Sequence, residues 1–288
     1  MHRMAFCTFK VFRPPLRKLP NNLVKDFTMD GYCPVTKLSY SDESHPSKGQ
    51  RDRRKNINTL LNRDKRGKNI NKYHDKNALK PTLRRHFYAL KNKHVAVIGT
   101  TIPWAEAILL NLGASKVTTI EYNKIKIKHP KVRVTTPYKF AAKFLNRTSD
   151  TFDAAFSFSS IEHSGLGRYG DPLMPYGDME AMAQIWCATK PGGYLFLGLP
   201  MTPGRKECAL WFNACRRYGY IRMQHLTANW KVLDEKNMFD GTHFLYVLQK
   251  LEWYENSKSI YASDFHYEKT DGCTIDSQSS YCILYYVL

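Results

Sequence analysis

The chain has 288 residues, enough for one domain with a substantial core, and its 43% hydrophobic content excludes a wholly disordered protein. No stretch approaches eighteen consecutive apolar residues, so no membrane-spanning helix is expected. The net charge of +19 is concentrated in the first third, because residues 1–93 carry 23 Lys and Arg against seven acidic residues. Residues 94–288 carry only +3, so the charge does not mark the whole chain as a nucleic-acid-binding protein.

Residues 1–93 form a basic N-terminal extension that we expect to be largely disordered, because few of its side chains are suited to a core. Its Lys and Arg clusters leave two alternatives open. Residues 51–68 bind nucleic acid or another acidic surface, or they form a solvated arm that keeps the protein soluble.

The seven cysteines form no C-x-x-C pair, and Cys208 and Cys215 have no partners at zinc-ligand spacing, so no metal site is expected. Their odd number and the absence of an apolar secretory segment favour reduced cysteines and an intracellular, cytoplasmic location. The basic N-terminus leaves organelle or nuclear targeting open.

From His94 onward, short apolar runs alternate with segments of helical spacing. The expected strands are 94–99, 117–120, 133–135, 152–158, 194–199, 230–233 and 243–251, the last two pairing with each other. The expected helices are 104–112, 138–145, 178–189 and 209–217. This order predicts an α/β fold over residues 94–255, a Rossmann-like, mostly parallel open sheet with helices on both faces. Residues 256–288 are expected to form a C-terminal tail.

Two residues are expected at the edge of such a sheet where ligands bind. Gly99 ends the first strand, where its backbone and that of Thr100 can approach an anionic group, and Glu121 ends the second, where an acid accepts hydrogen bonds from ribose hydroxyls. The turn lacks the G-x-G-x-x-G pattern with which a dinucleotide pyrophosphate is bound. S-adenosylmethionine (SAM) has no pyrophosphate, so the pattern favours SAM over NAD. An ordinary strand–turn–helix with a surface acid is the alternative.

The longest distinctive motif is S-F-S-S-I-E-H-S-G-L-G-R-Y-G-D-P at 157–172, followed by the turn K-P-G-G at 190–193. With E-Y-N at 121–123 and N-A-x-R-x-Y-G at 213–219, it resembles the domain-of-unknown-function family numbered 268, which is similar to class I SAM-dependent methyltransferases. One position departs from that family, because Cys215 stands where its pattern usually has histidine. If that histidine transfers a proton in relatives, this chain has lost the group or has replaced it with the thiol of Cys215.

The resemblance implies roles for the motif. Glu162 and His163 follow the fourth strand, whose carboxyl end faces the methyl group in such folds. His163 is therefore a candidate base, and Glu162 is a second candidate catalytic residue that orients His163 or binds an acceptor amine. Ser157, at the end of that strand, is assigned to the cofactor with Gly99, Thr100 and Glu121. The alternative is that the Glu-His pair only fixes the loop.

Residues 163–178 contain four glycines and form a loop that is expected to bind substrate. Arg168 is a candidate for an anionic group, Tyr169 for stacking on a ring or sugar, and Asp171 and Arg216 for further contacts. Asp178 is expected to cap the next helix. An internal ion pair for Arg168 and a turn-capping role for Asp171 remain the alternatives.

Two functions follow from these predictions. The first is a SAM-dependent methyltransferase acting on a small-molecule or glycan acceptor. The second is a catalytically silent Rossmann-like scaffold whose basic arm binds an acidic partner or nucleic acid. Under the first hypothesis, removal of residues 1–80 is expected to leave SAM binding intact.

Overall fold

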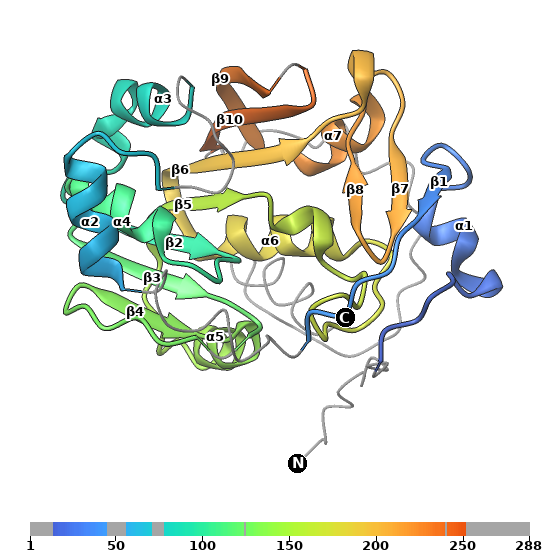
Figure 1. The fold of residues 1–288 in the computed structure, drawn as a ribbon, viewed down its shortest axis with the longest axis horizontal. Helices are drawn as coiled ribbons and strands as arrows, with labels where there is room; N and C mark the ends of the chain where they lie inside the picture. Colours follow the sequence, from blue (N-terminus) through green and yellow to red (C-terminus); the bar gives the residue numbers. More distant parts are fainter. Residues whose placement is uncertain (1–13, 45–55, 71–77, 124, 240, 252–288) are drawn as a thin grey trace, which may run out of the picture.

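The computed structural model describes residues 14–44, 56–70, 78–123, 125–239 and 241–251 (Figure 1). Its centre is a seven-stranded sheet in the order β4-β3-β2-β5-β6-β10-β9. The strands are β2 (His94–Ile98), β3 (Lys116–Ile120), β4 (Val132–Thr135), β5 (Phe152–Phe158), β6 (Thr189–Pro200), β9 (Trp230–Phe239) and β10 (His243–Lys250). The first five in the order are parallel, and β10 is antiparallel to both of its neighbours. This is the predicted fold class, a Rossmann-like, mostly parallel α/β sheet.

Helices cover both faces of this sheet because the central strands are apolar on both sides. One core cluster includes residues of α2 (Ile57–Lys65), α3 (Leu79–Arg85) and α4 (Trp104–Asn111). The other includes residues of α5 (Pro137–Leu145), α6 (Gly177–Ala188) and α7 (Tyr220–Leu226). Neighbouring residues of β5 alternate between the two cores, so Ala154 faces the α2–α4 side and Ala155 the α5–α7 side. No helix within the described ranges is long and apolar enough to cross a membrane.

The N-terminal extension is more ordered than the sequence predicts. Its described parts contain α1 (Val24–Phe27), β1 (Val35–Leu38), α2 and α3. On α2, Ile57 and Leu60 are buried in the core that α4 and the sheet share. The expectation of a largely disordered arm is therefore wrong for these segments, because a few apolar side chains at helical spacing dock on the domain.

A second, three-stranded sheet joins the arm to the C-terminal half. It lies at the right of Figure 1. It consists of β1, β7 (Ala209–Phe212) and β8 (Cys215–Arg217), with β1 parallel to β7. The predicted helix at 209–217 is thus wrong, and the segment is a hairpin. Asn213 turns it at a φ of 60°, and Leu210 and Phe212 bury their side chains against Phe27 of α1.

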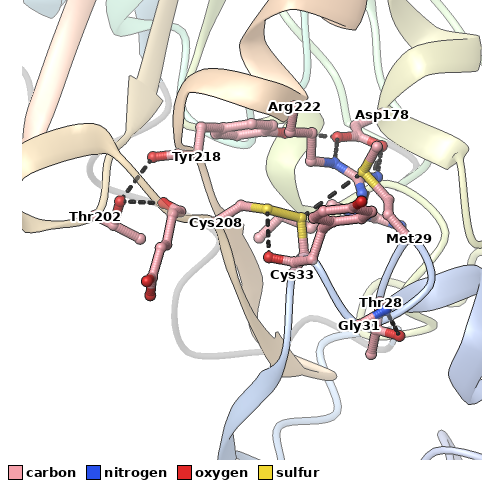
Figure 2. Close-up of a disulfide and its surroundings, with 12 residues drawn as sticks. Thr28, Met29, Gly31, Cys33, Asp178, Thr202, Cys208, Tyr218 and Arg222 are labelled. Carbon is pink, nitrogen blue, oxygen red and sulfur yellow. Dashed lines mark hydrogen bonds and ion pairs between the residues drawn. A yellow bond between two sulfur atoms is a disulfide. The ribbon is translucent and has the colours of Figure 1, made fainter.

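A disulfide closes this junction. Cys33, just before β1, is bonded to Cys208, just before β7, and both residues are buried (Figure 2). The expectation that the cysteines are reduced is therefore wrong for this pair, and the odd number of cysteines is no argument for a reducing compartment. Among the described residues, Cys215 is the free cysteine.

Candidate functional site

A cavity of about 410 Å³ opens where the order of the sheet reverses, between β2 and β5. The chain runs outward from β2 to β3 and β4 and then returns to the other side of β2 as β5. The loops after the two central strands consequently diverge and leave a crevice at their carboxyl ends. Its wall includes four predicted site residues that follow strands, namely Gly99 and Thr100 after β2, Glu121 after β3 and His163 after β5.

The turn after β2 is tight. Gly99 has a φ of +71°, and a Cβ at this position would lie 1.7 Å from the Oγ of Ser160. Only glycine therefore lets the turns after β2 and β5 approach this closely. The hydroxyl of Thr100 donates to the carbonyl of Ile102 at 2.6 Å, which holds the turn that leads into α4.

Glu121 places a buried carboxylate in the cavity wall. Its Oε1 accepts a hydrogen bond from the backbone N–H of Asn123 at 2.9 Å, and its side chain is 6% exposed. Burial raises the pKa of this carboxyl from about 4.5 to about 7. The cavity therefore holds an acceptor group that gains from hydrogen-bond donors on a ligand.

His163 lies in a short 3₁₀ turn, Ile161–His163, directly after β5. Its Nδ1 hydrogen-bonds to the backbone carbonyl of Ala214, and because a carbonyl only accepts, Nδ1 carries the hydrogen. In the neutral ring the lone pair is therefore on Nε2, which lies 3.6 Å from Oε1 of Glu162.

Glu162 is buried beneath this turn. Its Oε1 accepts from the hydroxyl of Ser159 at 2.7 Å, whereas its Oε2 makes no hydrogen bond within the described chain. Ser159 lines the cavity, and Glu162 stands behind it. The predicted orienting role of Glu162 is consistent with this position.

The loop after His163 contributes two more predicted residues, Tyr169 and Asp171. The ring of Tyr169 meets that of His163 edge-on, with the centroids 5.5 Å apart. The carboxylate of Asp171 accepts from the backbone N–H groups of Gly167 and Tyr169, each at 3.1 Å. Asp171 therefore has the turn-capping role that the sequence offered as an alternative, and it also lines the cavity.

Besides Glu162, three predicted site residues do not line the cavity, namely Arg168, Arg216 and Ser157. Arg168 forms an ion pair with Glu43 of the N-terminal segment, donating from Nε at 3.1 Å. Arg216 is 2% exposed and donates to the backbone carbonyls of Ser164, Met174 and Pro175. Ser157 is buried in β5, and its Oγ has no hydrogen bond within the described chain.

Arg216 and Arg168 instead hold the loop that carries the site. Asp178 receives the guanidinium of Arg222 through bonds of 2.6 and 2.8 Å, with Nε of Arg216 at 3.5 Å. Figure 2 includes Asp178 and Arg222 among the residues drawn around the disulfide. The two arginines hold the pKa of Asp178 down at about 2, although burial alone raises it. Asp178 is thus an ion-pair partner within the first turn of α6, and the expectation that it is the capping residue is wrong, because Tyr176 occupies the cap.

Cys215 lies at the turn of the β7–β8 hairpin, next to the Ala214 carbonyl that His163 contacts. Burial and the neighbouring Glu162 raise the pKa of its thiol to about 11. A thiol that stays protonated at neutral pH is a poor nucleophile and a poor base. It does not replace a histidine in proton transfer.

The structure adds cavity residues that the sequence did not indicate. Within the described ranges, Arg63 on α2 is the only Lys or Arg residue in the cavity wall. No ion pair joins it to another described residue. Glu180 on α6 also lines the cavity, and burial together with Asp178 raises its pKa to about 7. Arg63 lies in the basic run at 51–68, for which a solvated arm was one of the two alternatives. Glu180 belongs to no motif that would mark it as a site residue.

Three carboxylates act electrostatically on the hydroxyl of Tyr122. Half of this residue is exposed, but burial of its hydroxyl end raises the pKa to about 12, and the charges of Asp171, Glu180 and Glu121 act in the same direction. Since these four residues come from three different segments of the chain, their convergence is visible only in the folded structure.

Several solved structures are similar in fold. The 1,6-didemethyltoxoflavin-N1-methyltransferase of Burkholderia thailandensis, solved with 1,6-didemethyltoxoflavin and S-adenosylhomocysteine, is 14% identical, with a TM-score of 0.46 over 68% of this chain and 87% of that one. An S-adenosylmethionine-dependent methyltransferase of Mesorhizobium loti is 10% identical, with a TM-score of 0.42 over 59% and 96%. The N-methyltransferase NodS of Bradyrhizobium japonicum is 15% identical, with a TM-score of 0.39 over 62% and 99%.

No curated protein matches the sequence significantly. The profile of one protein family does match, over residues 92–251, which is more than half of the chain and contains β2 to β10 together with the predicted motif. The chain therefore belongs to the family described as Caenorhabditis protein of unknown function, DUF268.

Proposed function

We propose that this protein binds SAM in the cavity at the carboxyl edge of the sheet and transfers its methyl group to a small acceptor. The observation that carries the proposal is the meeting of Gly99, Glu121 and His163 around one cavity, although they follow three different strands. Each is a residue type suited to a different part of the reaction.

The residues present fit the cofactor. Glu121 supplies a buried carboxylate, which accepts hydrogen bonds from two neighbouring ribose hydroxyls. The turn of Gly99 and Thr100 would receive the amino-acid end, because both residues line the cavity at the end of β2. When bound, SAM supplies an electrophilic methyl group on a sulfonium centre.

His163 would remove the proton that the acceptor loses. Nε2 is the basic nitrogen of its neutral ring, and Glu162 at 3.6 Å stabilises the imidazolium that results. The hydrogen bond from Nδ1 to Ala214 fixes the orientation of the ring. In this role Glu162 is a positioning residue, because it lies behind the cavity wall.

The acceptor side of the proposal changes from what the sequence suggested. Arg168 and Arg216 are engaged in the frame of the loop, so an anionic acceptor has no partner in either. Tyr169 and Arg63 both line the cavity, where they would meet a ring or an anionic group of the acceptor.

The test is a calorimetric titration of the full chain with SAM, with NAD as the control ligand. We expect saturable binding of SAM with a micromolar Kd and none of NAD. Binding of neither ligand, or of NAD in preference, would refute the assignment.

A further inference from the structure

The cavity extends far beyond the edge of the sheet. Its wall on α6 consists of Gly177, Glu180, Ala181, Gln184, Ile185 and Ala188. These residues recur at spacings of three and four from the first to the last position of the helix, so they form one continuous stripe. At 1.5 Å per residue the stripe is about 17 Å long. The cavity thus follows the whole length of α6.

The opposite wall is the face of the sheet beneath α5 and α6. It is formed by Ala96 of β2, Ala155 and Phe152 of β5, Ile120 of β3 and Phe140 of α5. Phe152 is the first residue of β5 and pairs with Thr189, which follows the last residue of α6. The channel therefore reaches the amino edge of the sheet, opposite the edge where Glu121 and His163 lie.

Small side chains create this space. Ala96 and Ala155 are directly paired in the register of β2 and β5, so two alanines stand side by side in the floor. Ala188 closes the stripe on α6. A well-packed core fills such positions with larger side chains, and each methyl group missing from a buried site costs stability.

The two ends of the channel differ in polarity. At the carboxyl edge the wall contains Glu121, His163, Asp171 and Glu180. Toward the amino edge it is apolar, and its members Ala96, Ala155, Phe152, Ala188, Ile185 and Phe140 are each at most 7% exposed. A deep apolar channel with a polar mouth fits a ligand of the same form.

We infer that the acceptor is an amphipathic molecule, whose hydrocarbon chain lies in the channel between α6 and β5 and whose polar nucleophile lies beside His163. The inference rests on the proposed function for the reacting group, whereas the chain-binding channel stands on the cavity alone. Recognition comes from burial of successive methylene groups, each of which strengthens binding by a constant factor until the channel is full.

A matched pair of variants tests the channel. Ala155→Leu fills it, whereas Ala154→Leu, one residue earlier on β5, points into the packed core on the other face. We expect Ala155→Leu to keep or raise the Tm and Ala154→Leu to lower it, because only the first has space to fill. Ala188→Leu is a second filling variant at the far end, should the first fail to fold. A drop in Tm for both filling variants, as large as that for Ala154→Leu, would overturn the inference.

The ligand class is tested with a series of unbranched 1-alkanols, from butanol to dodecanol, which displace the fluorescent probe N-phenyl-1-naphthylamine. The Kd is expected to fall about fourfold per added methylene in the wild-type protein, from about 0.8 kcal/mol per buried CH₂. Ala155→Leu is expected to weaken binding of the longest alcohol at least tenfold. A Kd independent of chain length, or unchanged in the filled variant, would overturn the inference.

Saturation with S-adenosylhomocysteine separates the two proposals. If the alcohols still bind, the channel is distinct from the cofactor position, as inferred. If the cofactor product displaces them, the channel belongs to the adenosine moiety and the inference fails. Binding of the alcohols to a protein that binds no cofactor would leave the channel standing and refute the proposed function.

Discussion

The most direct test of the cofactor position is the pH dependence of binding in the wild-type protein and in Glu121→Gln. Burial raises the pKa of Glu121 to about 7, so near neutral pH a substantial fraction of the free protein is protonated at this carboxyl. A ribose diol binds best to the ionised form, because that form accepts two charge-assisted hydrogen bonds. Binding at low pH must therefore first remove a proton.

The expected change in Kd follows from how far the pH lies below the pKa of Glu121. At pH 8 nearly all of Glu121 is ionised, whereas at pH 6 only about one molecule in ten is, so the Kd for S-adenosylhomocysteine is expected to be about tenfold higher at pH 6. Glutamine keeps one acceptor and has no charge to titrate. In Glu121→Gln the Kd is thus expected to be independent of pH. At pH 8 it should be roughly 10- to 100-fold weaker than in the wild type, from about 1.5–3 kcal/mol for a hydrogen bond to a charged group.

The assay is calorimetric titration at pH 6, 7 and 8 in buffers of matched ionic strength. Unfolding of both proteins at each pH provides the control. A wild-type Kd that stays constant from pH 6 to 8 would refute the role of Glu121. A pH slope that persists in Glu121→Gln would assign the titrating group to another residue.

Three further predictions concern stability. Glu106 is wholly buried, and burial raises its pKa to about 7. Between pH 4.5 and 7 the folded protein therefore retains a proton that the unfolded chain loses, so the free energy of unfolding falls as the pH rises. Relative to the wild type, Glu106→Gln should raise the free energy of unfolding by up to about 3 kcal/mol at pH 9 and leave it unchanged at pH 4, and equal unfolding curves at pH 9 would contradict this. Asp178→Asn leaves the buried guanidinium of Arg222 unpaired and should cost roughly 3–5 kcal/mol in urea unfolding, so a loss under about 1 kcal/mol would count against a structural ion pair. Replacement of both Cys33 and Cys208 by serine should cost about 2–5 kcal/mol, and unchanged denaturation would show that the crosslink is not needed.

The alternating half of the chain was predictable because its strands are local patterns. The strands over 94–98 and 152–158 are runs of mostly apolar residues, and these form the centre of the sheet. The positions of Gly99 and Glu121 followed from the same pattern, because residues at the carboxyl ends of adjacent parallel strands meet at one edge. Both line the cavity.

The hairpin at 209–217 was not predictable in the same way. Its partner strand, β1, lies about 170 residues earlier in a segment that composition marked as an arm. A four-residue strand is held by its neighbours, so local spacing carries little information about it. The disulfide from Cys33 to Cys208 bridges the same two segments, and its pairing could not be read from cysteine spacing.

Charge alone also misled the assignment of the arginines. Arg168 lies in the glycine-rich loop and Arg216 packs against it, as substrate-binding residues do. However, Arg168 is paired with Glu43, and Arg216 is buried among backbone carbonyls. A loop with four glycines has many carbonyls that no regular structure satisfies, and a buried guanidinium satisfies several at once. The arginines that hold a functional loop therefore resemble, in sequence, the arginines that bind its ligand.

The boundary of the family match is not the boundary of the ligand-binding unit. The match begins at residue 92, whereas α2, at 57–65, lines the cavity with Arg63 and buries Ile57 in the main core. The amide of Asn111 at the end of α4 donates to the Leu61 carbonyl at 3.1 Å, which ties this helix to the matched region. Removal of residues 1–80 therefore takes away a wall of the cavity and exposes apolar core. The loss of SAM binding in such a fragment would be the expected consequence of an opened site, so this truncation does not distinguish an enzyme from a silent scaffold. Substitutions within the cavity, with the arm in place, do.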